Sequence, residues 1–239
     1  MKISEKLKMN AEGIRINGAI NIVAFGDSVT HGILGYNEVG YDTTYWNRLR
    51  NKILSIRNYV PVNVIDSGIE GITAKDSLER MDRDVISHNP DLVIIMFGLN
   101  DVNFPIEEYT ESLATMFKKC NENGIFTIFM TPNMLNTYVA EDTFEGYRTY
   151  AEKTAEMQNN GRMDMYIEAA KKIAEENNIP VCDCYSIWKE ISKTEDTTML
   201  LANRVNHPIR EMHELFADNL FKIIFADEPE ILEKYNSEK

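Results

Sequence analysis

Residues 21–32 read NIVAFGDSVTHG, and this stretch carries the clearest signal of the fold. An apolar run ends at Gly26, and Asp27, Ser28 and a second glycine, Gly32, follow it. Near-continuous apolarity is typical of a strand that is buried on both faces of a parallel sheet. A simple turn requires neither an acid nor a serine, so the end of this strand is a candidate place for a nucleophile.

Further short apolar runs alternate with amphipathic segments along the chain. We expect strands at about residues 20–25, 62–66, 92–97, 125–130 and 180–184. We expect helices at about residues 44–56, 74–87, 106–122, 147–177 and 209–225, the fourth broken near residues 158–164. This alternation predicts a single α/β domain, residues 19–239, with three layers (α/β/α) and a parallel sheet. Residues 1–18 are expected to form an N-terminal extension packed on its outside, with a short strand.

The composition is that of an ordinary globular protein. The 239 residues are 44% apolar and 26% charged, enough for one sizeable domain. The net charge of −13 is spread along the chain and argues against binding to nucleic acid or to an anionic membrane surface. No run reaches the roughly 18 consecutive apolar residues of a membrane helix, and the chain does not begin with a signal-peptide pattern. We therefore expect a cytoplasmic protein without membrane insertion.

The cysteine pattern predicts neither disulfides nor a metal site. Cys120, Cys182 and Cys184 are an odd number of cysteines in a chain of this length, which is typical of reduced and mostly buried thiols. No second pair of Cys or His lies at a zinc-site spacing. The oligomeric state stays open.

The residues that follow the expected strands matter most, because open parallel sheets carry their chemistry beyond the carboxyl ends of the strands. Ser28 follows the first strand, Gly71 lies in the loop after the second, and Asn100 follows the third. His207 comes after the fifth strand and a short helix, directly before the last helix. These four residues are therefore expected to converge on one edge of the sheet.

This set of residues suits acyl transfer. Serine is a weak nucleophile at its own pKa and needs an adjacent base, which His207 supplies. The backbone N–H groups of Ser28 and Gly71, with the side-chain amide of Asn100, give three donors to the oxyanion of a tetrahedral intermediate. His31 is a rival base, but it lies on the same tight turn as Ser28, so we favour His207.

The same residues form a series of motifs along the chain. They are Gly26-Asp27-Ser28, Gly71, Gly98-Leu99-Asn100-Asp101 and His207-Pro208. In this order and spacing the chain resembles the SGNH (GDSL) hydrolases over about residues 20–225. The resemblance implies a flavodoxin-like sheet of about five parallel strands in the order 2-1-3-4-5. It also implies ester hydrolysis without metal or cofactor, with Ser28 as nucleophile, His207 as base, and Ser28, Gly71 and Asn100 as the oxyanion hole.

One position departs from this family pattern. An aspartate usually lies three residues before the histidine and orients its ring, whereas this chain has Arg204 there, and an arginine accepts no hydrogen bond. Three interpretations stay open: a Ser–His dyad whose ring is held by a backbone carbonyl or water, a carboxylate from elsewhere, or a non-catalytic relative. We favour the dyad. Asp27 and Asp101 are interpreted as braces of their loops.

The sequence narrows the substrate to an ester. We predict a serine esterase that removes short acyl groups, such as acetyl, from a carbohydrate or small alcohol. The alternatives are a long-chain thioesterase or lysophospholipase, and an inactive module that binds an acylated sugar or a partner protein. Aromatic residues crowd the segments after the first and fourth strands, and we expect Tyr36 and Tyr138 to line the substrate pocket.

Overall fold

The computed structural model describes residues 1–237, so the last two residues of the predicted 19–239 domain lie outside the described residues. A five-stranded parallel sheet has the order β4-β1-β5-β6-β7. Its strands are β1 (Ile20–Gly26), β4 (Val62–Gly68), β5 (Leu92–Met96), β6 (Phe126–Met130) and β7 (Val181–Cys182). Counted along the chain this is the order 2-1-3-4-5, so the predicted flavodoxin-like α/β/α fold is confirmed.

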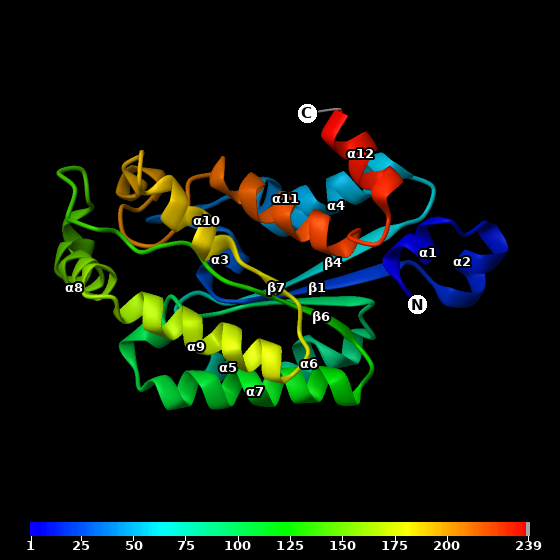
Figure 1. The fold of residues 1–239 in the computed structure, drawn as a ribbon, viewed down its shortest axis with the longest axis horizontal. Helices are drawn as coiled ribbons and strands as arrows, with labels where there is room; N and C mark the ends of the chain where they lie inside the picture. The colour runs from blue at the N-terminus through cyan, green and yellow to red at the C-terminus, as the bar shows by residue number, and fades with distance from the viewer. Residues whose placement is uncertain (238–239) are drawn as a thin grey trace.

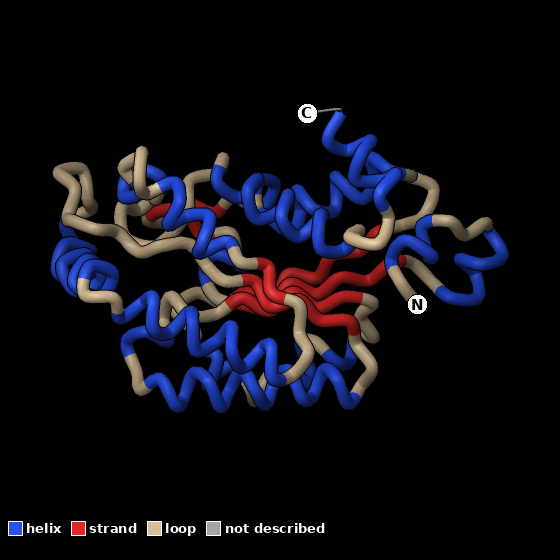
Figure 2. Tube along the Cα trace, viewed as in Figure 1, coloured by secondary structure: helices blue, strands red, loops and turns tan. Residues whose placement is uncertain are grey.

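Helices cover both faces of the sheet (Figures 1 and 2). One layer contains α4 and α11, which pack on each other, and the other contains α7 and α9. The helices between the first strand and residue 224 are α3 (Ser28–His31), α4 (Tyr45–Ile56), α5 (Ala74–Ser77), α6 (Met81–Asp84), α7 (Ile106–Glu122), α8 (Arg148–Asn159), α9 (Arg162–Glu176), α10 (Cys184–Ile191) and α11 (Met212–Ile224). Within residues 1–237, no helix has the length and apolarity needed to cross a membrane.

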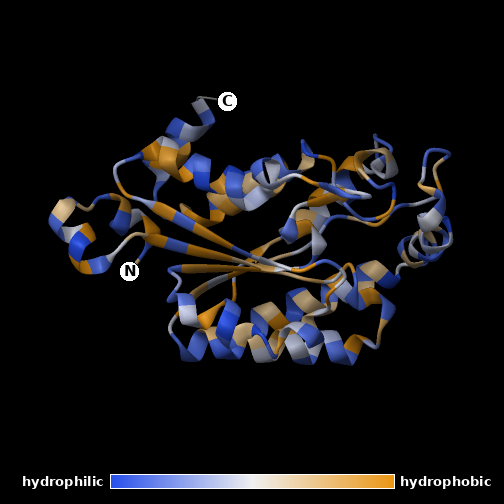
Figure 3. Cartoon of the chain, turned by 180° about the vertical axis from the view of Figure 1, so that it is seen from behind, coloured by the Kyte–Doolittle hydropathy of each residue, from blue (hydrophilic) through white to orange (hydrophobic). Residues whose placement is uncertain are grey.

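The double cover explains the apolar strands. Every residue of β5, at the centre of the sheet, is buried, and β1 beside it is buried along nearly its whole length. The strands accordingly form an apolar layer between helices whose outer faces are polar (Figure 3). The edge strand β4 is more exposed. Since all five strands are parallel, their carboxyl ends meet at one edge, on the left in Figure 1.

The N-terminal extension contains two helices, and the short strand that we expected there is wrong. They are α1 (Ile3–Leu7) and α2 (Ala11–Asn17), at the edge where the strands begin (Figure 1). Ile3 and Leu7 are buried in the core, and Lys6 pairs with Asp91 at 2.8 Å. Asn10 caps α2 by accepting the backbone N–H of Gly13, a cap that favours helix over strand.

The single helix predicted over residues 74–87 is also wrong. The chain forms α5, a turn, α6 and a 3₁₀ turn (Ile86–His88) instead. Arg80 lies in the turn between α5 and α6, and its buried guanidinium donates to the carbonyl oxygens of Ser67 (2.7 Å) and Gly26 (3.2 Å) at the ends of two strands. This tertiary contact holds the turn and overrides the helical periodicity.

Two expectations for residues 147–184 have different outcomes. The long helix breaks where predicted, between α8 and α9, at Gly161, whose φ of 82° favours glycine. The fifth strand, expected over residues 180–184, is limited to β7. Asp183 ends it, because its carboxylate accepts the N–H of Ser186 at 3.1 Å and caps α10. The cysteines are free and buried, as predicted.

Several short elements have no counterpart in the sequence analysis. A hairpin, β2 (Ile33–Gly35) and β3 (Glu38–Val39), follows α3, and α12 (Pro229–Ser237) ends the described chain. On α12, the ring of Tyr235 packs on Phe221 of α11, with ring centroids 4.3 Å apart. The other 3₁₀ turns are Tyr41–Thr43, Asp101–Asn103, Glu145–Tyr147 and Thr197–Leu200. The hairpin lies beside the edge where the strands end, and it shapes the site described next.

Candidate active site

Ser28 stands at the rim of the sheet because β1 ends directly before it. A Cβ atom on Gly26 would lie 2.6 Å from the carbonyl oxygen of Met96, so glycine allows β1 and β5 to approach closely where β1 ends. Ser28 begins α3, and Asp27 caps this helix by accepting the N–H of Val29 at 3.0 Å. Ser28 is almost completely buried, which places its hydroxyl inside the edge of the sheet.

His207 lies against Ser28 although the two residues are far apart in the chain. Its Nε2 is 2.9 Å from Ser28 Oγ, and its Nδ1 is 3.3 Å from the carbonyl oxygen of Leu34 in β2. A carbonyl oxygen only accepts hydrogen bonds, so this contact assigns the proton of the neutral ring to Nδ1. Nε2 then presents its lone pair to the Ser28 hydroxyl, which is the arrangement that proton transfer from serine to histidine requires.

Burial sets the charge of this histidine. It lowers the pKa of His207 to about 4, while the bond to Leu34 opposes that shift. The ring is therefore neutral at pH 7 and able to accept a proton. Protonation as the pH falls through about 4 would remove the lone pair that faces Ser28.

The side chain of Asn203 holds the loop before His207 in place. Asn203 Oδ1 accepts the backbone N–H groups of Val205, Asn206 and His207, each at 3.0 Å. The backbone N–H of Ala202 also donates to the carbonyl oxygen of His207 at 2.6 Å. The sequence analysis missed this role of Asn203, although an asparagine in a polar loop is the usual signal of such a turn.

Arg204, at the sequence position where the resemblance implies an aspartate, has partners other than the histidine ring. It has a φ of 59°, and its guanidinium pairs with Asp142 at 2.9 Å and donates to the carbonyl oxygen of Leu201 at 2.7 Å. The far nitrogen of His207 faces the Leu34 carbonyl, as in one form of the dyad interpretation. The structure thus has a backbone oxygen at Nδ1, the atom that an aspartate would contact in the pattern that the resemblance implies.

Gly71 and Asn100, the other two predicted site residues, line the same pocket as Ser28 and His207. Gly71 has a φ of 72°, and a Cβ atom there would meet nothing within 4 Å, so the backbone angle accounts for glycine without any crowding by the protein. Asn100 Nδ2 donates to the carbonyl oxygen of Ile72 at 3.0 Å. Since this amide nitrogen has two N–H groups, one remains to serve a bound substrate.

Two buried carboxyl groups brace these loops. Asp101 accepts the N–H of Ala74 at 2.8 Å and that of Gly98 at 2.9 Å, which joins the loops after β4 and β5. Burial raises the pKa of Asp101 to about 6 and that of Asp27 to about 7. Both residues thus have the bracing contacts that we predicted.

The pocket around Ser28 is small, with a volume of about 140 Å³. Besides the predicted residues, Glu70, Tyr147, Tyr150 and three residues of the loop before His207 line it: Asn203, Val205 and Asn206. The sequence analysis noticed the tyrosines only as part of an aromatic cluster. Tyr147 directly precedes α8 and Tyr150 lies in its first turn, so their separation of three residues was the available signal.

The two tyrosines predicted to line the substrate pocket are not in the lining of the hollow around Ser28. Tyr36 lines a second, adjacent pocket and stacks on Phe144, with ring centroids 4.9 Å apart. Tyr138 is not among the lining residues of the Ser28 pocket, and its hydroxyl donates to Asp196 at 2.6 Å. That bond directs Tyr138 to a neighbouring loop.

The other histidines have separate environments. His31 Nε2 is 3.4 Å from the hydroxyl of Tyr41, and His88 is exposed in its 3₁₀ turn. His213 is buried in α11, where its Nδ1 accepts the N–H of Tyr45 at 3.2 Å, and burial lowers its pKa to about 3. His207 is thus the histidine that the structure places at Ser28.

Comparison with known proteins identifies the family. Residues 24–215 match the GDSL-like Lipase/Acylhydrolase family. The chain belongs to this family. An acetylxylan esterase of Geobacillus stearothermophilus is 26% identical over 228 residues, 85% of this chain and 93% of the relative. An arylesterase of Vibrio mimicus is 30% identical over 109 residues, 45% of this chain and 54% of the relative. Together, the family match and these esterase relatives show that the chain is an enzyme that hydrolyses ester bonds.

Solved structures of esterases and acylhydrolases resemble the structure of this chain. Axe2, an acetylxylan esterase from Geobacillus stearothermophilus, is 25% identical with a TM-score of 0.65, over 86% of this chain and 94% of that chain. A lipase/acylhydrolase from Enterococcus faecalis, 24% identical with a TM-score of 0.66, over 87% and 96%, shares the fold. Axe2 variants that lack a serine, a histidine, or an aspartate three residues before that histidine are described as catalytic mutants. This GDSL-family chain has Arg204 at that spacing.

Proposed function

We propose that this hydrolase removes short acyl groups, above all acetyl, from carbohydrate or small-alcohol esters by a Ser28–His207 mechanism. The observation that carries the proposal is the distance of 2.9 Å between His207 Nε2 and Ser28 Oγ. As Ser28 attacks the ester carbonyl carbon, its hydroxyl proton passes to Nε2. His207 then protonates the leaving alkoxide, and water, deprotonated by the same ring, hydrolyses the acyl-enzyme.

The Leu34 carbonyl takes over the orienting role of the missing aspartate. A carboxylate in a serine triad fixes the tautomer of the histidine, and a wrong tautomer costs about 10⁴-fold in kcat. The contact of Leu34 with Nδ1 fixes the same tautomer without a charge. Arg204 is therefore compatible with a working Ser–His pair, and the inactive-module alternative loses its main support.

Three donors support the oxyanion in this proposal. Ser28 is the first residue of α3, so its N–H has no acceptor inside that helix. Gly71 and Asn100 line the same pocket, and the second N–H of the Asn100 amide is available after the bond to Ile72. Donors fixed before the reaction stabilise the developing charge without reorganisation.

Replacing Asn100 by alanine is expected to lower kcat by about 10²- to 10³-fold, the usual loss for one oxyanion donor. The measurement is steady-state hydrolysis of p-nitrophenyl acetate, with Asn123→Ala, an exposed asparagine at the end of α7, as the matched control. Wild-type kcat in Asn100→Ala would remove Asn100 from the oxyanion hole.

The pocket favours a short acyl group. Its volume of about 140 Å³ is below the roughly 300–1,000 Å³ of pockets that hold drug-sized ligands. Its lining, among residues 1–237, includes Glu70 but no lysine or arginine. Lysophospholipids and coenzyme A thioesters carry phosphates, which Glu70 and the net charge of −13 would repel. Both observations favour a neutral acetyl ester over the long-chain alternatives.

A series of p-nitrophenyl esters from acetyl to palmitoyl tests this proposal. We expect kcat/KM to be highest for acetyl or propionyl and to fall at longer chains, because the hollow around Ser28 has a volume of only about 140 Å³. A rise toward long chains would favour the lipase or thioesterase alternative. No turnover of any ester would contradict the proposed mechanism.

A further inference from the structure

A second hollow lies directly beside the Ser28 pocket. It has a volume of about 110 Å³ and shares Tyr147 and Asn203 with that pocket. Its own lining includes Tyr36, Phe144 and Arg204. The two hollows are therefore neighbours, and a substrate held at Ser28 has the second hollow beside it.

Aromatic rings form one wall of this second hollow. Tyr36, from the turn of the β2–β3 hairpin, and Phe144, from the loop before α8, stack with an interplanar angle of 19°. Phe144 also makes an edge contact with Tyr147, with ring centroids 5.4 Å apart. Tyr36 is 63% exposed and Phe144 is 48% exposed, so the pair offers apolar ring surface to solvent beside the reaction centre.

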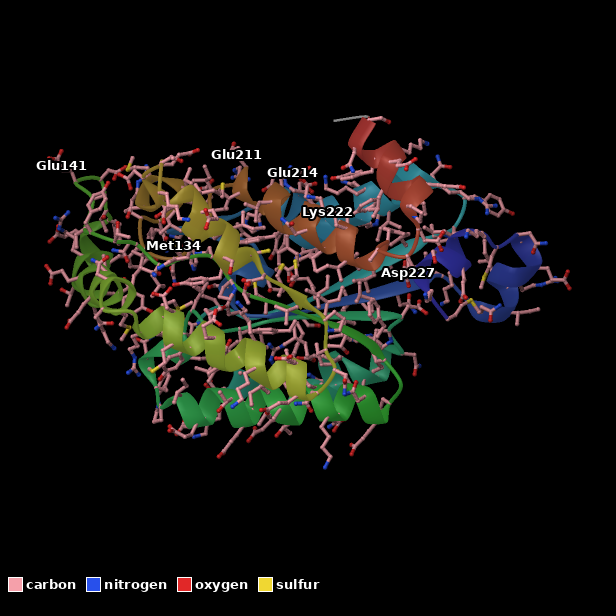
Figure 4. All side chains as sticks on the ribbon, in the orientation of Figure 1. Met134, Glu141, Glu211, Glu214, Lys222 and Asp227 are labelled. Carbon is pink, nitrogen blue, oxygen red and sulfur yellow. The ribbon has the colours of Figure 1, made fainter. Side chains whose placement is uncertain are left out.

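A fixed polar pair forms the other wall. Arg204 binds Asp142 through both Nε and Nη2, and its Nη1 donates to the carbonyl oxygens of Met199 and Leu201. Within the described residues these bonds use four of the five guanidinium N–H groups. The loop of Asp142 is marked in Figure 4 by its neighbour Glu141, at the end of the molecule opposite the N-terminal helices. This wall therefore presents a guanidinium N–H donor of Arg204 next to the carboxylate oxygens of Asp142, which accept hydrogen bonds.

We propose that this second hollow is a subsite for the sugar ring next to the acetylated one, so that the natural substrate is a neutral acetylated oligosaccharide. The inference rests on the proposed function of Ser28 and His207. The C–H face of a sugar ring packs on aromatic rings such as Tyr36, and vicinal hydroxyl groups need paired donors and acceptors like Arg204 and Asp142. Because Asp142 compensates the charge of Arg204, the subsite favours a neutral ligand over a phosphate or carboxylate.

Two substrates that differ only beyond the reacting sugar test this subsite. They are monoacetylated xylotriose and monoacetylated methyl xyloside, and the quantity of interest is the ratio of their kcat/KM values. We expect a wild-type ratio of about ten or more, and a fall of about tenfold in Tyr36→Ala, mainly through KM; tenfold corresponds to about 1.4 kcal/mol. Tyr36→Trp, which keeps an aromatic face, is expected to retain the ratio.

The matched control is Tyr59→Ala, since Tyr59 is also exposed (52%) but lies before β4, at the opposite edge of the sheet. It should keep the wild-type ratio. An equal loss on both substrates in Tyr36→Ala would mean that the stack only holds two loops together, and it would overturn the subsite. A wild-type ratio of about one would overturn it as well.

Binding separates this inference from the proposed function. If the wild type hydrolyses neither these acetates nor any p-nitrophenyl ester, the Ser28–His207 proposal fails, and calorimetry with unacetylated xylotriose decides the subsite alone. Binding to the wild type that weakens in Tyr36→Ala but not in Tyr59→Ala would support the subsite. Equal binding to all three proteins, or none, would overturn it.

Discussion

Replacing Ser28 by alanine is expected to lower kcat for p-nitrophenyl acetate by about 10⁴- to 10⁶-fold, the range for loss of a serine nucleophile. No acyl-enzyme forms without its hydroxyl, and the remaining donors stabilise only attack by water. The fold should persist, because Asp27, not Ser28, caps α3 and the change removes one oxygen atom. Initial rates and a thermal melt of the same preparation measure both effects.

Ser112→Ala is the matched control for this variant. Ser112 is also buried, but it lies on α7 and its hydroxyl donates to the carbonyl oxygen of Glu108 at 2.6 Å. It should keep wild-type kcat. Turnover in Ser28→Ala within tenfold of the wild type would show that another group attacks the ester.

The elements of the fold were predictable from sequence where the local hydropathy pattern matches the burial of the residues in the structure. The apolar strands were predictable because a parallel sheet that is covered on both faces needs apolar residues throughout, as β5 shows. The single helix over residues 74–87 failed because Arg80 reaches the carbonyl oxygens of Ser67 and Gly26. Such a contact joins residues that are distant in the chain, so the helical periodicity of the local sequence does not predict it.

The site was predictable to the extent that it consists of side chains after strands. Ser28, Gly71, Asn100 and His207 could be placed together because the strands end at one edge. The contact of Leu34 with His207 could not be assigned, since every residue has a carbonyl oxygen and the sequence does not show which one faces the ring. The hairpin that brings Leu34 there has only three and two residues in its strands, too short for a clear alternation.

Replacing His207 by alanine is expected to lower kcat by about 10⁴- to 10⁶-fold as well, because the serine loses its base. His207→Gln keeps a polar side chain and should lose about as much, since an amide does not accept the proton. His88→Ala, a change at an exposed histidine, should leave turnover unchanged. Comparable activity in His207→Gln and the wild type would exclude His207 as the base.

The pH dependence of kcat/KM gives a further test of His207 that requires no change to the ring. Burial lowers its pKa to about 4, so the neutral, competent form persists as the pH falls from 7 to about 5, and activity is lost only as the pH passes through about 4. Asp27, with a pKa raised to about 7, and Asp101, with a pKa raised to about 6, are buried groups in the loops of the site that would add a change at higher pH, and Asp27→Asn and Asp101→Asn remove them. A loss of activity centred near 6.5 that persists in both Asp27→Asn and Asp101→Asn would mean that the ring titrates like an exposed histidine, and it would contradict a base held neutral by burial against the Leu34 carbonyl.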